Sequence, residues 1–240
     1  MSARASSDSQ VPRILAFDTS TERVLVAVVG GEQCWSRVAA GGAASSGTLL
    51  PTIDAVLREA GCTLAELSAV AFCAGPGAFT GVRTGAAVAQ GLALAHDLPV
   101  LPLNALELLA AGADGVIGVV IDARMHEVYF AAYRVRDGAL TELVAPAVGA
   151  AEVALRELGA VAADGLRLVG QPELLGETEL ASADREARTI DADRLADGAR
   201  RAWRLGLAVA PESAQPLYVR NKVALTTAER AARNASIEAA

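Results

Sequence analysis

The segment from Gly75 to Arg83, GPGAFTGVR, has the composition of a loop that could hold an anion. Its three glycines permit backbone angles and close approaches that side chains forbid. Thr80 is placed to cap a following helix, whose first N–H groups attract negative charge. A tightly packed strand-to-helix turn explains the composition equally well, and neither the Walker nor the GxGxxG spacing is present. The residues of this signature are Gly75, Pro76, Gly77, Phe79, Thr80, Gly81 and Arg83.

Two short turns carry carboxylates at the ends of apolar runs. Asp18, Thr19 and Ser20 follow the first run, and Asp122 ends a comparable run in the second half. A carboxylate beside hydroxyl groups could hold a metal-bound phosphate at a strand tip. Any short turn between strands prefers the same residue types, because their side chains bond to nearby backbone groups. Both interpretations stay open for each turn.

Residues that would form a metal centre or an activated nucleophile are missing from the sequence. The two histidines, His96 and His126, lie far apart and show no HExxH or paired-ligand spacing. No serine stands in a GxSxG elbow, and the three cysteines form no CxxC pair. We therefore expect no catalytic residue, no metal ligand and no cofactor bound by this chain alone.

The elements that must position these residues occur in the same order twice. In each half, three strands are followed by a helix, a strand and a second helix. The elements expected in the first half are Arg13–Thr19, Arg23–Gly30, Glu32–Ala39, a helix from about Gly47, Ala69–Ala74 and Thr80–His96. Those expected in the second half are Val116–Ala123, Glu127–Val135, Leu140–Ala145, Gly149–Leu158, Arg167–Gly170 and Ala192–Leu207.

This repetition predicts two α/β lobes, each with the order βββαβα, because two copies of one order indicate a duplicated domain. The first lobe is expected over residues 13–103 and the second, smaller one over 104–220. Residues 1–12 have the composition of a disordered lead-in, and residues 221–240 that of a tail.

Composition narrows the class of function. The 240 residues carry a formal net charge of −7 and are 52% hydrophobic. The strong basicity typical of a protein that binds nucleic acid unaided is absent, so a nucleic-acid role would need a partner or a local patch. Arg200, Arg201 and Arg204 around Trp203 form one such patch, although a solvated helix face explains them as well. With no apolar run of about 18 residues, we expect no membrane span and a cytoplasmic protein.

The helix after the glycine segment is built from small, uncharged residues. From Gly85 to Ala95, GAAVAQGLALA, no charge occurs over three turns. Small side chains let another backbone come close, and an uncharged surface costs little to desolvate. Burial in the chain's own core and an interface with a partner therefore remain equally open.

Together these motifs resemble the TsaB family, whose members are the dimerisation subunit of the bacterial complex that makes threonylcarbamoyladenosine next to the tRNA anticodon. The resemblance covers about Ile14 to Arg220. The matching segments, in chain order, are ILAFDTST at Ile14–Thr21, LLPTIDAVL at Leu49–Leu57, AFCAGPGAFTGVRTGAAVAQGLALA at Ala71–Ala95, DAR and EVYFAAY within Asp122–Tyr133, and PLYVR at Pro216–Arg220.

The resemblance implies a fold of duplicated ribonuclease-H-like or actin-like (ASKHA) lobes, in agreement with the repeated order. It implies that catalysis belongs to a larger paralogue, TsaD, and that an ATPase, TsaE, completes the set. This chain would pair with TsaD, or with itself when TsaD is absent, and meet tRNA only through the complex. Pairing would use the helices at about Thr48–Ala60 and Thr84–His96. The interface candidates are Leu49, Leu50, Ile53, Ala86, Ala89, Gln90 and Ala93.

Two positions depart from the family pattern. Ser45 stands where many relatives have histidine, and Ala78 replaces the usual serine of the glycine segment. The first change removes a metal ligand, and the second weakens any ligand role of the segment, so that Asp18, Thr19 and Ser20 form at most a vestigial phosphate site. The alternative is a small-molecule kinase or ATPase of the same fold in which Asp18 orients a metal. A metallopeptidase, an activity once attached to the wider family, lacks a zinc ligand set here.

Overall fold

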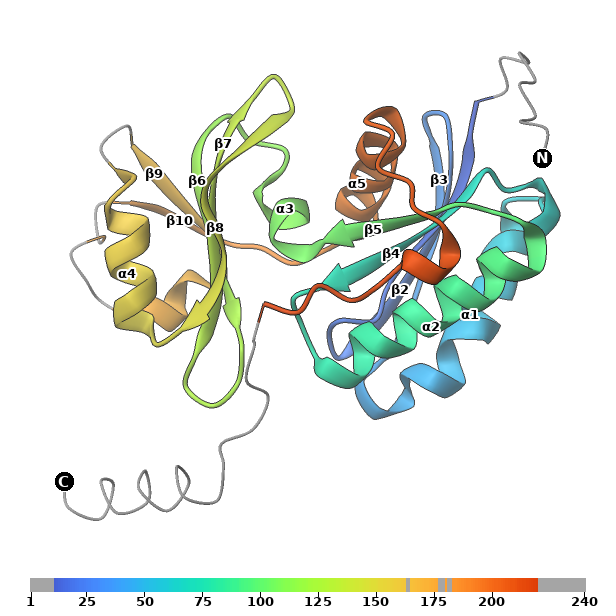
Figure 1. Ribbon diagram of the computed structural model, residues 1–240, viewed down its shortest axis with the longest axis horizontal. Helices are drawn as coiled ribbons and strands as arrows, with labels where there is room; N and C mark the ends of the chain where they lie inside the picture. The colour runs from blue at the N-terminus through green and yellow to red at the C-terminus, as the bar shows by residue number, and fades with distance from the viewer. Residues whose placement is uncertain (1–10, 163–164, 177–179, 181–182, 220–240) are drawn as a thin grey trace.

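The computed structural model describes residues 11–162, 165–176, 180 and 183–219, and shows two lobes that each contain a five-stranded mixed sheet (Figure 1). The strand orders are β3-β2-β1-β4-β5 and β10-β9-β6-β7-β8. The predicted fold class of duplicated α/β lobes is confirmed. Residues 1–10 of the predicted lead-in and the whole predicted tail, residues 221–240, lie outside the described residues.

The first sheet combines an antiparallel meander with two parallel strands. Its central strands β1 and β4 are buried almost throughout, as expected for strands covered on both faces. Helices α1 and α2 cover one face (Figure 1). The elements are β1 (Arg13–Asp18), β2 (Arg23–Gly30), β3 (Gln33–Ala40), α1 (Ser45–Glu59), β4 (Ala69–Gly75), α2 (Phe79–His96) and β5 (Val100–Asn104).

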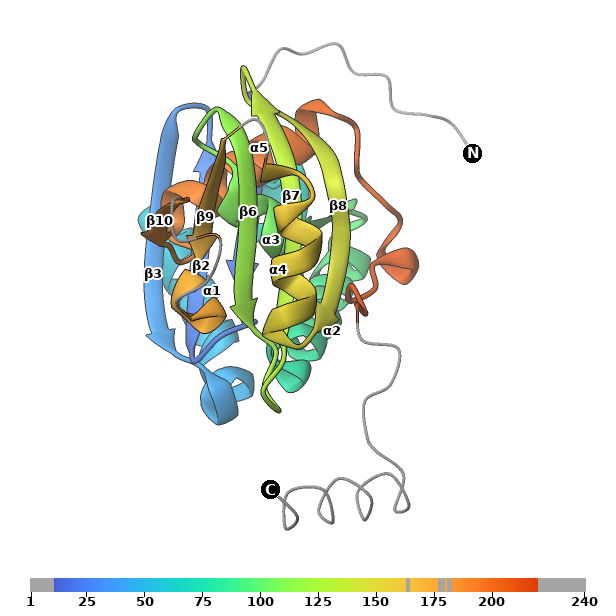
Figure 2. The same cartoon turned by 90° about the vertical axis from the view of Figure 1, so that its left-hand side faces the viewer.

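The second sheet repeats this arrangement, with α4 over its outer face (Figure 2). Its edge strand β10 was not predicted, because DREA has neither an apolar run nor alternation, and its parallel pairing with β9 depends on tertiary contact. The elements are β6 (Gly115–Asp122), β7 (Val128–Arg136), β8 (Ala139–Gly149), α4 (Ala151–Gly159), β9 (Leu166–Gly170) and β10 (Asp184–Ala187).

Two further helices join the lobes. Asn104 caps the beginning of α3 (Ala105–Ala110), where its side chain accepts a hydrogen bond from the Leu106 N–H at 2.9 Å. Helix α5 (Ala192–Arg204) follows the second sheet in the chain but packs on β1, β2 and β5 of the first. Its apolar stripe and α3 share one core with residues of both sheets. The spatial lobes therefore differ from the expected division at residue 103, because α5 covers the face of the first sheet opposite α1 and α2.

The chain after α5 returns along α2. This C-terminal strap, residues 205–219, pairs with β5 through hydrogen bonds between Val209 and Val100 at 2.8 and 2.9 Å. Farther on, Gln90 donates to the Ala214 carbonyl at 3.0 Å, and the Leu217 N–H donates to the Ala74 carbonyl at 2.8 Å. Among the described helices, none is long and apolar enough to cross a membrane.

Candidate functional site

The turn between β1 and β2 lies buried against the beginning of α2. The Ala78 N–H donates to the Ser20 carbonyl at 2.8 Å, and the Thr19 hydroxyl donates to the Gly81 carbonyl at 2.7 Å. Asp18 accepts from the Ser20 N–H at 2.7 Å. The carboxylate turn and the glycine segment, distant in sequence, thus form one packed unit.

The turn between β1 and β2 lies so close to the segment Gly75–Arg83 that the segment needs glycine at the points of contact. A Cβ atom at Gly77 would lie 2.6 Å from the Ser20 Cβ, and one at Gly81 would lie 1.9 Å from the Thr19 carbonyl oxygen. Gly75 has a φ of +104°, which side chains disfavour. Of the two interpretations that the sequence left open, these contacts support the packed turn.

Thr80 does not cap α2, so that prediction was wrong. The helix begins one residue earlier, at Phe79, and its N-cap residue Ala78 makes no side-chain capping bond. Thr80 already lies inside the first turn, where its carbonyl accepts the Thr84 hydroxyl at 3.0 Å. The Ser20 carbonyl, which accepts from Ala78, holds the beginning of the helix in place.

Asp18 has an environment that disfavours its charge. Its side chain is 2% exposed, and burial raises its pKa, although hydrogen bonds from Ser20 act in the opposite direction. The neighbouring Cys73 thiol, also buried, contacts the Ser20 hydroxyl at 3.8 Å. Neither Asp18 nor Thr19 lines the cleft between the lobes. The Asp18 carboxylate is therefore placed to stabilise its own turn rather than to contact a ligand in the cleft.

The Asp18→Asn variant is expected to become more stable relative to the unaltered chain as the pH rises, measured as the difference between their free energies of unfolding. A raised folded-state pKa means that the native state holds its proton more tightly than the unfolded state does. The contribution to stability is therefore full below the ordinary value of 3.8 and is lost as the pH rises through the folded pKa. Asparagine keeps an oxygen to accept from Ser20 and never ionises.

Urea unfolding of both chains at acid and neutral pH measures this difference. A relative loss of stability by D18N with rising pH would contradict the assignment, since it would mean that the ionised carboxylate stabilises the fold. Asp122→Asn is the matched control, because Asp122 occupies the corresponding turn of the second lobe but is half-buried.

The turn between β6 and β7 repeats the geometry of the first turn. Asp122 accepts from the Arg124 N–H at 2.8 Å, as Asp18 does from Ser20. Arg124 also lies 3.4 Å from Glu22 of the first lobe, so an ion pair spans the two turns. The duplication therefore extends to the hydrogen bonds of the turns.

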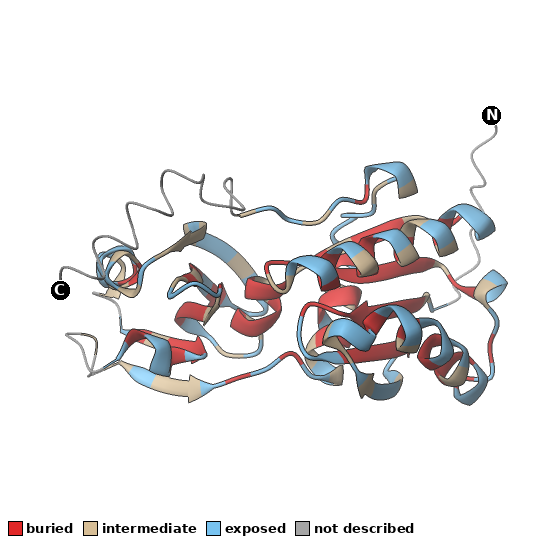
Figure 3. Ribbon diagram, turned by 90° about the horizontal axis from the view of Figure 1, so that it is seen from below, coloured by how far each residue is buried: buried red, intermediate tan, exposed pale blue. Residues whose placement is uncertain are grey.

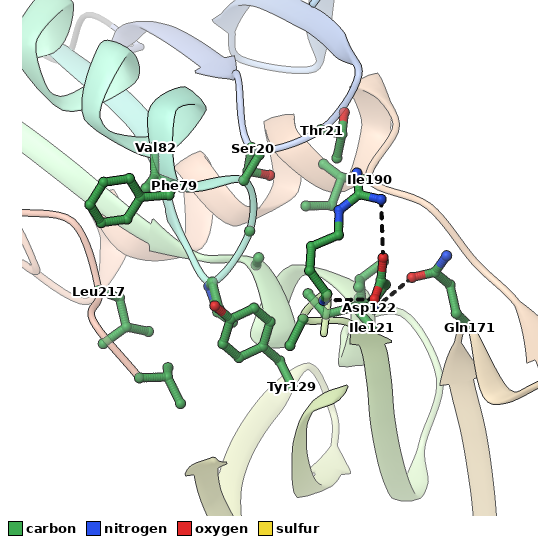
Figure 4. Close-up of a pocket in the computed structure, with 18 of the residues that line it drawn as sticks. Ser20, Thr21, Phe79, Val82, Ile121, Asp122, Tyr129, Gln171, Ile190 and Leu217 are labelled. Atoms are coloured by element: carbon green, nitrogen blue, oxygen red, sulfur yellow. Dashed lines mark hydrogen bonds and ion pairs between the residues drawn. The ribbon is translucent and has the colours of Figure 1, made fainter. Parts of the chain in front are cut away.

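A cleft of about 650 Å³ opens between the two turns (Figure 4). Phe79 and Leu217 lie on one side, and Ile121 and Tyr129 on the other (Figure 4). Among the described residues, no group of three histidine, cysteine, aspartate or glutamate side chains is arranged to hold a metal ion.

The seven interface candidates separate into buried and accessible residues. Five of them are at most 5% exposed and belong to the core beneath α1 and α2, so their assignment to a partner interface is corrected. Their physical role is different: small side chains on α2 let the helix lie close to β4. Gln90 is half-buried and bonded to the strap, whereas Leu50 is 51% exposed. The buried five are Leu49, Ile53, Ala86, Ala89 and Ala93.

The outward sides of the two helices carry the accessible surface (Figure 3). Exposed, uncharged residues recur there at helical spacing on both helices. Sequence reasoning found only Leu50 among them, because the buried and exposed positions of α2 are alike small and uncharged. We define this outer face as Gly47, Leu50, Pro51, Ala87, Gly91 and Leu94.

Arg83 of the signature holds the strap. Its guanidinium lies 3.7 Å from the centre of the Phe79 ring and 5.6 Å from that of Tyr218, and its Nε donates to the Tyr218 hydroxyl at 3.1 Å.

The arginine patch around Trp203, suspected of binding nucleic acid, is partly occupied by contacts within the chain. Arg200 donates to the Gly31 carbonyl at 2.9 Å, and Arg201 donates to Glu107 at 2.6 Å.

Comparison with known proteins links this geometry to a family. Over 223 residues the chain is 35% identical to the tRNA threonylcarbamoyladenosine biosynthesis protein TsaB of Escherichia coli (strain K12), covering 88% of this chain and 96% of that protein. The chain belongs to the TsaB family. TsaB of Haemophilus influenzae is 44% identical over 124 residues, which cover 49% of this chain and 52% of that protein.

Family and structure comparisons agree with this membership. The TsaD family model, described as tRNA N6-adenosine threonylcarbamoyltransferase, matches residues 41–176. A Pseudomonas aeruginosa protein described as similar to the peptidase YeaZ superposes with a TM-score of 0.76 at 33% identity, covering 87% of this chain and all 100% of that one. YeaZ from the same organism gives 0.71 at 32% identity, covering 86% and 99%. TsaB membership supports a role in tRNA threonylcarbamoyladenosine biosynthesis.

Proposed function

We propose that this chain is a non-catalytic subunit of the tRNA threonylcarbamoyladenosine synthesis complex and pairs with TsaD through its outer face. The observation that carries the proposal is an uncharged stripe over the first two turns of α1 and from Ala87 to Leu94 of α2, in which Leu50 is 51% and Leu94 is 65% exposed. Apolar side chains that stay in water at helical spacing favour contact with another helical surface. Family membership makes TsaD the partner to test first.

The environment of Asp18 supports the non-catalytic assignment over a kinase or ATPase. A carboxylate that orients a metal must face its ligand, whereas Asp18 is buried and occupied with the Ser20 N–H. We therefore expect this chain alone to bind no nucleotide, metal or other cofactor. The threonylcarbamoyl transfer itself is assigned to TsaD.

The remaining partners follow from the same proposal. TsaE is expected to join the pair of TsaB and TsaD, and the outer face would also serve a homodimer when TsaD is absent. With a net charge of −7, the chain is expected to meet tRNA through the complex rather than directly. Work on tRNA makes the cytoplasm its expected location.

Reconstitution tests the proposal. Purified TsaD and TsaE with tRNA, ATP and the threonylcarbamoyl donor are expected to modify the tRNA only when this chain is added. Omitting the chain should reduce the rate to background, because TsaD then lacks the surface that orders it. A D18N chain should restore the full rate, since the carboxylate has no catalytic role. Full activity without the chain, or none with D18N that folds, would contradict the assignment.

A further inference from the structure

The cleft between the lobes has the size and lining of a site for a small molecule. Its volume of about 650 Å³ lies within the range of ligand pockets, roughly 300–1,000 Å³. Apolar side chains from both lobes face it, including Phe79, which is 42% exposed, and Leu217, which is 37% exposed. Aromatic and aliphatic surface left in water between two walls gains free energy when an apolar group covers it.

Three backbone N–H groups in the turns around the cleft already have internal partners. The Ser20 N–H bonds to Asp18, and the Arg124 N–H bonds to Asp122. The Ala78 N–H, at the beginning of α2, bonds to the Ser20 carbonyl. A phosphate that used these three groups would have to displace their internal bonds, which disfavours a nucleotide in the cleft.

The charges around the cleft largely neutralise one another. Arg124 lies 3.4 Å from Glu22 and 3.5 Å from Asp122. Arg188 pairs with Glu186 and donates to the Leu109 carbonyl at 2.8 Å.

Arg23, which also lines the cleft, is different. Its guanidinium has no side-chain hydrogen bond or ion pair among the described residues, and its side chain is exposed. Gln171 has a similar capacity, because its amide oxygen accepts from the Asp122 N–H at 2.8 Å and leaves its NH₂ group able to donate. Both groups favour an anionic or hydrogen-bond-accepting end on a ligand.

We propose that this cleft binds a small organic anion with an apolar body. Its carboxylate or sulfonate pairs with Arg23, and its body lies between Phe79 on one wall and Ile121 and Tyr129 on the other (Figure 4). The strap forms part of the wall through Leu217. This site is separate from the outer face and does not depend on the pairing with TsaD.

Fluorescence titration of the full chain with 8-anilinonaphthalene-1-sulfonate, an apolar ring system with one sulfonate, tests the site. We expect saturable binding at one site. Arg23→Gln and Phe79→Ala should each raise the dissociation constant about fivefold, because the first removes an exposed ion pair and the second a partly buried ring. Arg58→Gln and Val38→Ala remove an exposed arginine and an exposed valine outside the cleft and should leave the dissociation constant unchanged.

Competition defines the chemistry of the ligand. Octanoate should displace the probe, octanol should do so less well, and inorganic phosphate or Mg-ATP should not. Binding that does not saturate, or that R23Q and F79A leave unchanged in chains folded by circular dichroism, would overturn the site. Displacement by Mg-ATP but not by octanoate would overturn the proposed ligand class in favour of a nucleotide.

Discussion

Replacing Gly81 with alanine is expected to destabilise the protein by about 3 kcal/mol or more, at or beyond the upper end for overpacked cores. The new Cβ would lie 1.9 Å from the Thr19 carbonyl oxygen, a backbone atom that no rotamer change can move aside. Separating the turn from the helix would also break the 2.7 Å bond from the Thr19 hydroxyl to Gly81 and the 2.8 Å bond from Ala78 to Ser20. Strain and lost hydrogen bonds therefore act in the same direction.

Gly91 provides a matched control in the same helix. A Cβ atom there would meet nothing within 4 Å, so Gly91→Ala brings only the higher helix propensity of alanine. It is expected to stabilise the chain by about 0.5–1 kcal/mol. Urea unfolding of the two variants beside the unaltered chain gives both differences. Equal stabilisation by G81A and G91A would show that the Thr19 carbonyl does not lie in close contact with Gly81 of α2.

The contact at Gly81 also shows what local sequence could not reveal. The segment GPGAFTGVR indicates a tight turn. The atoms that approach its glycines belong to Thr19 and Ser20, which the pairing of β1 with β4 brings there. A phosphate loop and a packed turn have the same composition, because both need glycine where another group comes close. Only the tertiary contact separates the two interpretations.

Helix α2 presents the same difficulty in another form. Its buried and exposed positions alternate at helical spacing, with Ala89 buried and Ala87 and Gly91 exposed, yet all three are small and uncharged. Hydrophobic periodicity identifies a core-facing side only when the opposite side is polar. The sequence thus predicted the helix and its uncharged character, but could not indicate which residues remain accessible.

The strands, in contrast, were predicted closely. β2 was predicted with its observed bounds, Arg23–Gly30, since a run of β-branched residues between polar turns is an unambiguous local signal. The short edge strand β10 and the packing of α5 on the first sheet have no such signal. Both depend on which surface the rest of the chain leaves uncovered.

Placing a charge on the outer face is expected to abolish association with TsaD while the chain stays folded. Leu50→Arg and Leu94→Arg alter side chains that are 51% and 65% exposed, so neither arginine is buried in the isolated chain. At an interface the same charge would be desolvated without a partner, which typically costs 3–5 kcal/mol. The affinity should therefore fall by more than about 100-fold, since each 1.4 kcal/mol is a factor of ten.

The control must carry the same charge on another surface. Val38 is 58% exposed on β3 and pairs with Leu25, whose side chain lies in the core on the α5 side of the sheet. Val38→Arg should therefore bind TsaD as the unaltered chain does. Ala89→Arg is not a usable test, because Ala89 is fully buried and a charge there would unfold the lobe before any partner is met.

Calorimetric titration of TsaD with each variant, together with the rate of tRNA modification, measures the effect. L50R and L94R should lose binding and modification together, with circular dichroism unchanged. If both bind like V38R, the outer face is not the contact with TsaD, and its exposed leucines need another occupant. If only L94R loses binding, the contact lies toward the end of α2 rather than across both helices, because Leu50 belongs to α1 and Leu94 to the last turns of α2.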